Sequence, residues 1–221
     1  MWTIEVWRMI GRGILESVYM TLTATLFGYV LGLPWGVVLA VTDEGGIKPN
    51  APVYRVLDFI TNIMRSIPFL ILLILIIPLT RLIVGKSYGS TATIVPLVVS
   101  AAPFIARMVE SSLKEVDAGV IEAAQSMGAN NFQIVTKVLL PEAKPALIMG
   151  AVISMVTILG YSAMSATIGG TGLGQIAISY GHQRFNPDIK WICVFLTVII
   201  VQIIQEVGTA IAHRTDKRIS K

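Results

Sequence analysis

A long run without charged side chains extends from Ser17 to Thr42, near the start of the chain. A helix needs about 20 predominantly apolar residues to cross the hydrocarbon core of a bilayer, and this run is longer than that. It is also longer than the apolar core of a secretory signal peptide, roughly 7–15 residues, so we expect it to remain in the mature protein. Because hydrocarbon offers the backbone no hydrogen-bond partner, such a run must cross the membrane as a helix.

Four more apolar stretches follow, so the sequence predicts an all-α polytopic membrane protein with five transmembrane helices in one domain, residues 1–221. The predicted spans are about 17–42, 57–80, 89–106, 145–167 and 191–212. Only 14% of the residues are charged, against about 25% in soluble domains. The lysines and arginines lie between apolar runs rather than in one patch, so no nucleic-acid partner is expected.

Prolines indicate where these helices depart from regularity. Residues 1–16 are expected either to lie at the membrane interface or to extend the first span, in which Pro34 predicts a kink. In the second span, Ser66-Ile67-Pro68 predicts a helix break just inside the membrane. The uncharged core after Arg65 is short, so we expect this arginine near the lipid headgroups.

The polar segments contain no nucleotide site. Val84-Gly85-Lys86-Ser87 matches the end of a phosphate-binding loop, but that loop also needs a glycine at the position of Thr80. Gly169 to Gly174 follows an apolar helix rather than a strand, which predicts a re-entrant or loop segment, and Ser179 to Lys190 predicts a polar loop. The chain is therefore not expected to hydrolyse ATP or to bind a cofactor.

Histidine, cysteine and acidic side chains give no sign of a metal site. His182 and His213 lie far apart, and neither has ligands at metal-binding spacing. Cys193 is the only cysteine, so it cannot form a disulfide within the chain. Glu206 is the one acid within the last span, and we interpret it as an interfacial or helix-pairing acid rather than a proton site.

A polar stretch from Glu122 to Pro141 interrupts the apolar pattern between the third and fourth spans. Its sequence, EAAQSMGANNFQIVTKVLLP, predicts a helix, a turn and a second short helix over about residues 132–139. Gly128 supplies backbone freedom, and Asn130 and Asn131 supply turn and N-cap chemistry. Pro141 is expected to end the second helix, because it has no backbone N–H.

This stretch resembles the EAA loop of the permease subunits of bacterial ABC importers, with Val138 at a position where isoleucine is commoner. The resemblance implies a coupling loop over residues 113–142, where an ATPase subunit docks at the cytoplasmic face and holds ATP and Mg²⁺. It implies a set of ATPase-coupling residues: Glu122, Ala123, Ala124, Gly128, Leu140 and Pro141.

Four further motifs are similar to the permease subunits of methionine ABC importers. They are RSIPF from Arg65, AAPFIARMVE from Ala101, GYSAM from Gly160 and GLGQ from Gly172. The resemblance covers about residues 11–205. It implies ATP-driven import of L-methionine, and of D-methionine and related analogues, by alternating access across the bacterial cytoplasmic membrane. It also implies a homodimer, two ATPase subunits and an extracytoplasmic methionine-binding lipoprotein.

Basic residues predict the orientation in the lipid bilayer. With an odd number of spans the termini lie on opposite sides, and a cytoplasmic C-terminus places more lysines and arginines inside than outside. The residues then on the cytoplasmic side are Lys48, Arg55, Arg65, Arg107, Lys114, Lys137, Lys144, Arg214, Lys217, Arg218 and Lys221. The N-terminus is therefore predicted outside.

The outer part of the fourth span holds the candidates for the translocation path: Tyr161, Ser162 and Met164. Small and hydroxylated residues there are also typical of plain helix packing. In a homodimer, however, a residue on the two-fold axis meets its own copy. Paired Met164 side chains would then form a flexible apolar gate.

Three alternatives remain open from the residues alone. The chain could be an ABC permease for another small solute, an ion-coupled secondary transporter, or a structural membrane protein. A secondary transporter usually keeps acids within the membrane, and a structural protein leaves the coupling loop unexplained.

Overall fold

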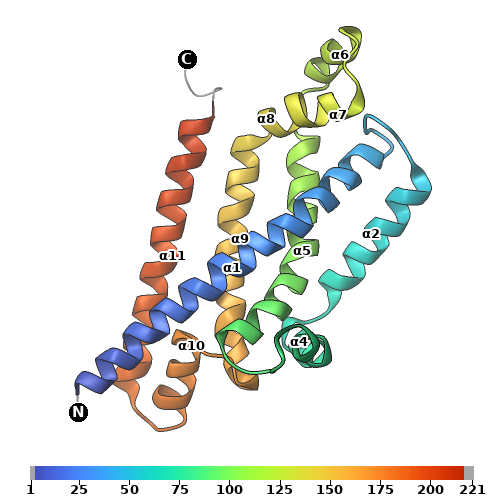
Figure 1. The fold of residues 1–221 in the computed structure, drawn as a ribbon. Coiled ribbons are helices and arrows are strands. Elements are labelled where there is room, and N and C mark those ends of the chain that lie inside the picture. The colour runs from blue at the N-terminus through green and yellow to red at the C-terminus, as the bar shows by residue number, and fades with distance from the viewer. Residues whose placement is uncertain (1–2, 217–221) are drawn as a thin grey trace.

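The computed structural model describes residues 3–216, and within this range the chain forms helices and no strand (Figure 1). The helices are α1 (Ile4–Thr42), α2 (Ala51–Ser66), α3 (Phe69–Leu75), α4 (Ile77–Val84), α5 (Ser90–Lys114), α6 (Ala118–Ser126), α7 (Asn131–Ile134), the π-helical turn η1 (Val135–Leu139), α8 (Leu140–Glu142), α9 (Lys144–Met164), the 3-10 turn η2 (Ser165–Ile168), α10 (Leu173–Ile176), the π-helical turn η3 (Ala177–His182) and α11 (Pro187–Thr215).

Four of these elements are long and apolar enough to cross a membrane: α1, α5, α9 with η2, and α11. The pair α2 and α3 reaches the required length only together, and the two helices are bent by 101° at their junction. The second span, predicted as one segment over 57–80, is therefore a broken one. The break lies at Ile67 and Pro68, as predicted, because a residue before proline is pushed into extended backbone.

The first helix is longer than its predicted span. It runs unbroken for 39 residues, so the segment before Ser17 extends the helix rather than forming a separate interfacial element. Arg12 and Glu16 pair one turn apart on its surface at 3.0 Å. Pro34 lies inside the helix without ending it. In Figure 1, α1 crosses the other long helices at a steep angle.

Close packing of α1 on α5 forms the centre of the protein. Gly28, Gly32 and Gly36 recur every four residues on the face of α1 that meets α5. A Cβ atom on Gly32 would lie 2.7 Å from the carbonyl oxygen of Ala102, so only glycine lets the two backbones approach this closely. Leu97, Ile105 and Val109 of α5 are fully buried beside this contact.

The segment after η2 folds back onto the start of α1. Ser17 Oγ accepts a hydrogen bond of 2.9 Å from the backbone N–H of Leu173, which begins α10. Ile10, Leu173, Ile176 and Cys193 share a small apolar core there. The polar loop predicted over 179–190 is wrong, because η3 continues to His182 and α11 already begins at Pro187. The sequence analysis missed α10 and η3 because they are only four and six residues long, too short to give a helical pattern.

Candidate functional site

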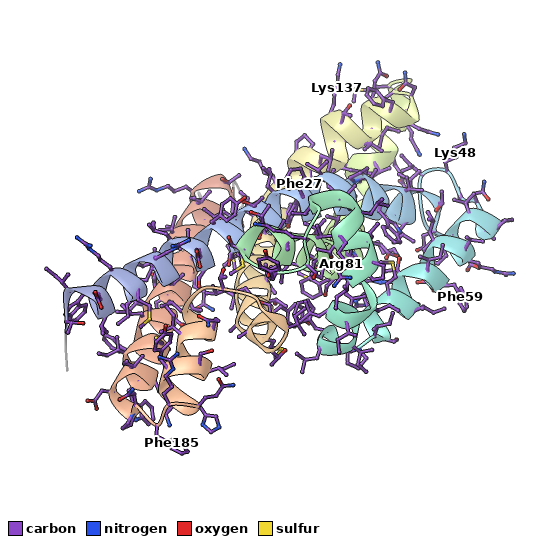
Figure 2. The ribbon with its side chains drawn as sticks, turned by 60° about the horizontal axis from the view of Figure 1, so that its bottom comes forward. Phe27, Lys48, Phe59, Arg81, Lys137 and Phe185 are labelled. Atoms are coloured by element: carbon purple, nitrogen blue, oxygen red, sulfur yellow. The ribbon has the colours of Figure 1, made fainter. Side chains whose placement is uncertain are left out.

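The candidate coupling loop projects beyond the ends of the long helices. In Figure 1, α6, α7 and α8 lie at the end of the molecule where α11 finishes, and α1 begins at the opposite end. Figure 2 labels Lys137 on this projecting part and Phe185 at the other end of the molecule. The helix–turn–helix is therefore displayed on one end face, where a partner can reach it.

The first helix of this loop has an aspartate cap at its start and a glycine at its end. The Asp117 side chain accepts a hydrogen bond of 2.8 Å from the backbone N–H of Gly119 and caps the start of α6. Gly128 ends the helix with a φ of +79°, in the left-handed region that favours glycine. The turn therefore lies at the residue where the sequence predicted it.

The second helix begins with a capping box. Asn130 Oδ1 accepts from the backbone N–H of Gln133, and Gln133 Oε1 accepts from the backbone N–H of Asn130, both at 2.9 Å. The prediction that Pro141 ends this helix is wrong, because the helical path continues through it to Glu142. The preceding turn is π-helical, and Leu140 donates to the carbonyl of Val135. In a π-helical turn the backbone N–H bonds to the carbonyl five residues earlier instead of four. This change occurs next to Pro141, which has no backbone N–H to donate.

The predicted coupling residues fall into two groups. Glu122, Ala123, Gly128 and Pro141 are exposed. Ala124, which is 4% exposed, and the half-buried Leu140 pack into the main core instead. These two residues therefore anchor the loop to the long helices, while the exposed group is free to meet a partner.

Two further residues on this loop were missed by the sequence analysis. Met127 is 81% exposed and Phe132 is 76% exposed, on either side of the Gly128 turn. Large apolar side chains displayed this way outside the bundle are typical of interaction sites. The available signal was their placement at the tip of a polar segment.

A charged network fastens the loop end of α5 to its neighbours, and the sequence analysis missed this too. Glu110 is 2% exposed and accepts hydrogen bonds from Arg107 Nη1 at 2.7 Å, Lys114 Nζ at 2.8 Å and Tyr54 Oη at 3.1 Å. The spacing of Arg107, Glu110 and Lys114 places them on one helix face.

Both cations of this network reach other helices. Arg107 pairs with Asp58 of α2, and Lys114 pairs with Asp43, just after α1, at 2.9 Å. The network therefore connects α1, α2 and α5 at the level from which the coupling loop departs.

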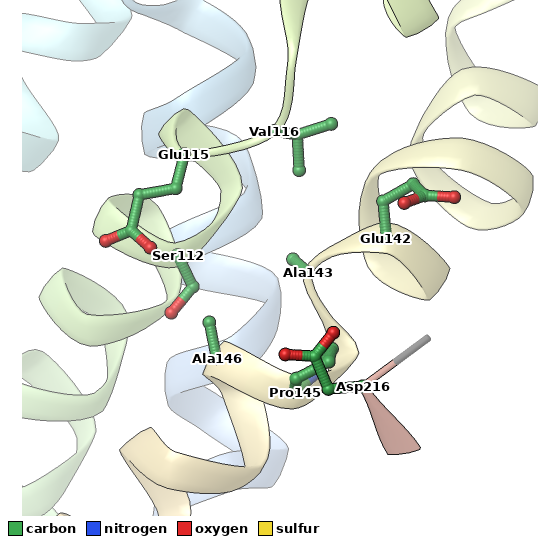
Figure 3. A pocket seen from close by; sticks show the side chains of 8 residues that line it. All are labelled: Ser112, Glu115, Val116, Glu142, Ala143, Pro145, Ala146 and Asp216. Atoms are coloured by element: carbon green, nitrogen blue, oxygen red, sulfur yellow. The ribbon is translucent and has the colours of Figure 1, made fainter. Parts of the chain in front are cut away.

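A small cavity of about 180 Å³ lies beneath the coupling loop, between the end of α5, the α8–α9 junction and the end of α11 (Figure 3). Glu115, Glu142 and Asp216 line it. The carboxylates of Glu115 and Glu142 point in opposite directions in Figure 3. Within residues 3–216, no group of three His, Cys, Asp or Glu side chains could hold a metal ion.

The three path candidates lie in different environments near the end of α9. Ser162 is 2% exposed, and its hydroxyl donates to the carbonyl of Leu159, so it packs inside the subunit. Tyr161 stacks on Phe69 of α3 with ring centroids 4.4 Å apart. Met164 is 45% exposed on the molecular surface. Only Met164 and Tyr161 are thus placed to meet anything outside the chain.

Arg65 lines a cavity with Ser100 of α5 and Thr157 of α9, both in the middle stretches of their helices. Because α2 begins at Ala51 near the coupling end, Arg65 is the next-to-last residue of a 16-residue helix. Its Cα is about 21 Å along the axis from the start of α2. Its placement near the lipid headgroups stays a prediction.

Comparison with known proteins gives consistent matches. Residues 32–221 match the family model described as "Binding-protein-dependent transport system inner membrane component". The chain is 48% identical over 216 residues to a probable D-methionine transport system permease protein of Pasteurella multocida, covering 98% of this chain and 100% of the relative. It is 56% identical over 156 residues to the D-methionine transport system permease protein of Escherichia coli K12, covering 71% of this chain and 72% of the relative.

A solved structure matches equally well. It shows inward-facing conformations of the MetNI methionine ABC transporter, and one of its chains superposes with a TM-score of 0.96 at 48% identity. The match covers 98% of this chain and 100% of the other.

Proposed function

Since the chain belongs to the family of binding-protein-dependent transport system inner membrane components, we propose that it is the permease subunit of an ATP-driven importer of methionine. It carries D-methionine, L-methionine and related analogues. The assignment of the substrate rests on relatives that match nearly the whole chain and are described as probable D-methionine transport system permeases. The fold supports the same conclusion, because a chain of the MetNI methionine transporter superposes over almost its full length.

One observation carries the ATP-driven part of this proposal: the helix–turn–helix displayed beyond the bundle with Met127 and Phe132 exposed. Two copies of the chain assemble around a path, and an ATPase subunit docks on the coupling loop of each copy. ATP and Mg²⁺ bind to those ATPase subunits rather than to the permease. An extracytoplasmic binding lipoprotein delivers the substrate to the opposite face.

The coupling loop is built to transmit motion as well as to bind. Ala124 and Leu140 fix it to the main core, so movement of the loop also moves α5 and α9. The charged network around Glu110 extends the connection to α1 and α2. Nucleotide-driven closure of the ATPase pair then rocks the two permease halves between outward-open and inward-open states.

Methionine enters the path through an outer gate. Met164 is the exposed apolar residue at the end of α9, and two copies meeting on the two-fold axis close the path. Tyr161 lies one turn earlier, against Phe69 of the broken second span. A change in the α2–α3 bend therefore alters the surroundings of the path directly.

Co-purification and reconstitution test this proposal. The tagged chain, isolated from its native membrane, should bring an ATPase subunit with it. The complex in proteoliposomes should take up methionine only when ATP is present on the side of the ATPase subunits and binding protein is present on the other side. Transport by the chain alone, or uptake that ignores ATP, contradicts the proposal.

Gly128→Trp gives a matched test of coupling. The substitution fills the exposed turn and requires an unfavourable backbone angle, so the variant should insert in the membrane but lose ATPase association. Gly45→Trp is the control, because Gly45 is also exposed and has no atom within 4 Å of an added Cβ. Full uptake by the Gly128 variant would remove this turn from the docking site.

A further inference from the structure

A cavity of about 250 Å³ lies at the break in the second span, where α2 and α3 meet α5 and α9. Ligand pockets for drug-sized molecules are about 300–1,000 Å³, so this cavity suits a smaller solute. Arg65 is the one charged side chain among its lining residues. The cavity is therefore small, cationic and bounded by helices that the proposed mechanism moves.

The guanidinium of Arg65 is unpaired among the residues that the structure describes. Within residues 3–216 it makes no hydrogen bond or ion pair, and it is exposed. Arg107 provides the contrast, because Asp58, Asn62 and Glu110 satisfy its guanidinium. No carboxylate lines the Arg65 cavity, so the charge is available to an anion from outside.

This charge lies beside the middle stretch of α5, one of the helices long enough to cross a membrane. Ser100, which lines the same cavity, lies about 15 Å along α5 from Ser90 and about 21 Å from Lys114. An arginine at such depth is costly against lipid, and in known membrane proteins it faces a partner or a water-filled path. Since no residue within 3–216 pairs with Arg65, we infer that the cavity opens toward a water-filled path.

The remaining walls combine hydroxyls with apolar surface. Among the described contacts, the hydroxyls of Ser100 and Tyr161 make no hydrogen bond, and Thr157 donates to Ile153 while keeping its acceptor lone pairs. Phe104 and Met64 supply apolar surface beside them. A cation, several hydroxyl acceptors and an apolar wall match the three parts of a zwitterionic amino acid with an apolar side chain.

We propose that this cavity is a substrate subsite on the translocation path, in which Arg65 binds the α-carboxylate of the transported amino acid. The ammonium group is held by the hydroxyls of Ser100 and Thr157, and the apolar side chain lies against Phe104 and Met64. The inference rests on the proposed function and adds a specificity: the permease itself selects a free carboxylate.

Binding to the purified permease–ATPase complex, without binding protein, tests the subsite. Radiolabelled L-methionine is measured by equilibrium binding, with the ATPase subunits alone as the background to subtract. Arg65→Gln should weaken binding at least about tenfold, because a charge-assisted hydrogen bond is lost, and Arg65→Lys should recover part of it. Arg55→Gln is the matched control, since Arg55 is exposed on the same helix outside the cavity.

A carboxylate-free competitor separates recognition from a general structural effect. Methionine amide should compete poorly for the wild-type complex, and Arg65→Gln should abolish the difference between the amide and methionine. Equal affinity for the two ligands in the wild type, or an Arg65→Gln variant that binds methionine as the wild type does, overturns the inference.

A protection experiment detects binding that is too weak for equilibrium measurement, and a folded comparison variant separates loss of binding from misfolding. In a Cys193→Ser background, methionine at millimolar concentration should slow thiol modification of Thr157→Cys, and this protection should vanish when Arg65→Gln is added. Arg55→Gln, on the same helix but outside the cavity, serves as the folded comparison, and gel filtration shows whether each variant is assembled. Absence of protection in the wild-type Arg65 background overturns the subsite.

The two proposals fail in different ways. If the wild-type complex shows no ATP-driven methionine uptake, the proposed function fails. If uptake is normal and Arg65→Gln leaves both binding and uptake unchanged, only the subsite fails.

Discussion

Arg107 donates from Nη1 to Oε2 of Glu110 across 2.7 Å, and this carboxylate is 2% exposed. Burial removes the water that would otherwise solvate the Glu110 carboxylate, so this charge depends on Arg107 and on the remaining members of the network. This contact, near the loop end of α5, connects the long helices to the segment that carries the coupling loop.

Removal of Arg107 should therefore be costly. Arg107→Met should lower the free energy of unfolding by roughly 3 kcal/mol, because it leaves the buried carboxylate of Glu110 underpaired and removes the partner of the half-buried Asp58. Arg12→Met breaks the exposed pair with Glu16 and should cost about 1 kcal/mol or less. Thermal unfolding of the two purified variants in detergent compares them, and equal shifts would show that the buried network adds nothing.

The glycine stripe on α1 gives a steric prediction. Gly32→Val should prevent assembly of α1 on α5, since even a Cβ would lie 2.8 Å from Ile105 Cγ2 and 2.7 Å from the Ala102 carbonyl. The expected result is a large loss of folded protein after extraction. Gly11→Ala is the control, because no atom lies within 4 Å of the added carbon and alanine favours helix by about 1 kcal/mol. A stable Gly32→Val protein would contradict close backbone contact.

Phe132 should be an anchor for the ATPase subunit. Phe132→Asp replaces an exposed apolar side chain with a charge and should weaken ATPase association by at least about tenfold, as for a central interface residue. Lys48→Gln changes an exposed residue near the same end, between α1 and α2, and should leave association unchanged (Figure 2). Pull-down with the ATPase subunit measures both. Unaltered association of the Phe132 variant would place the interface elsewhere.

The orientation in the bilayer can be tested by labelling. The proposal places the N-terminus outside and the coupling loop and C-terminus inside. In a Cys193→Ser background, an impermeant thiol reagent should label Thr3→Cys in intact cells and Gln125→Cys only in opened membranes. Labelling of Gln125→Cys from outside reverses the topology. Lys217, Arg218 and Lys221, which support the orientation by charge, lie outside the described residues.

The gate hypothesis predicts a crosslink that depends on nucleotide. Met164→Cys should form a disulfide between the two permease copies while the outer gate is closed, and should lose it when ATP is trapped. Ser162→Cys is the control, because this side chain is buried within one subunit and should not crosslink. If Met164→Cys expresses normally but crosslinks in no nucleotide state, the residue does not lie on the two-fold axis.

Local chemistry explains which features could be predicted from the sequence. Uncharged runs predict helices wherever they lie, because a backbone in hydrocarbon must bond to itself. The break at Ile67-Pro68 and the turn at Gly128 are also local, since proline restricts its predecessor and glycine tolerates positive φ. The sequence by itself therefore determined an all-helical membrane protein with a polar helix–turn–helix between two spans.

The positions of Arg65, Ala124 and Phe132 were decided only by the tertiary structure. In the sequence, Ala124 and Phe132 lie in the same polar stretch, yet one packs into the main core and the other faces outward. Arg65 follows an apolar helix face and is predicted as a headgroup anchor, but the packing of α2 against α5 brings it to a cavity that α9 also lines. Burial and depth depend on how helices distant in the sequence cross one another, and no local pattern contains the crossing angle.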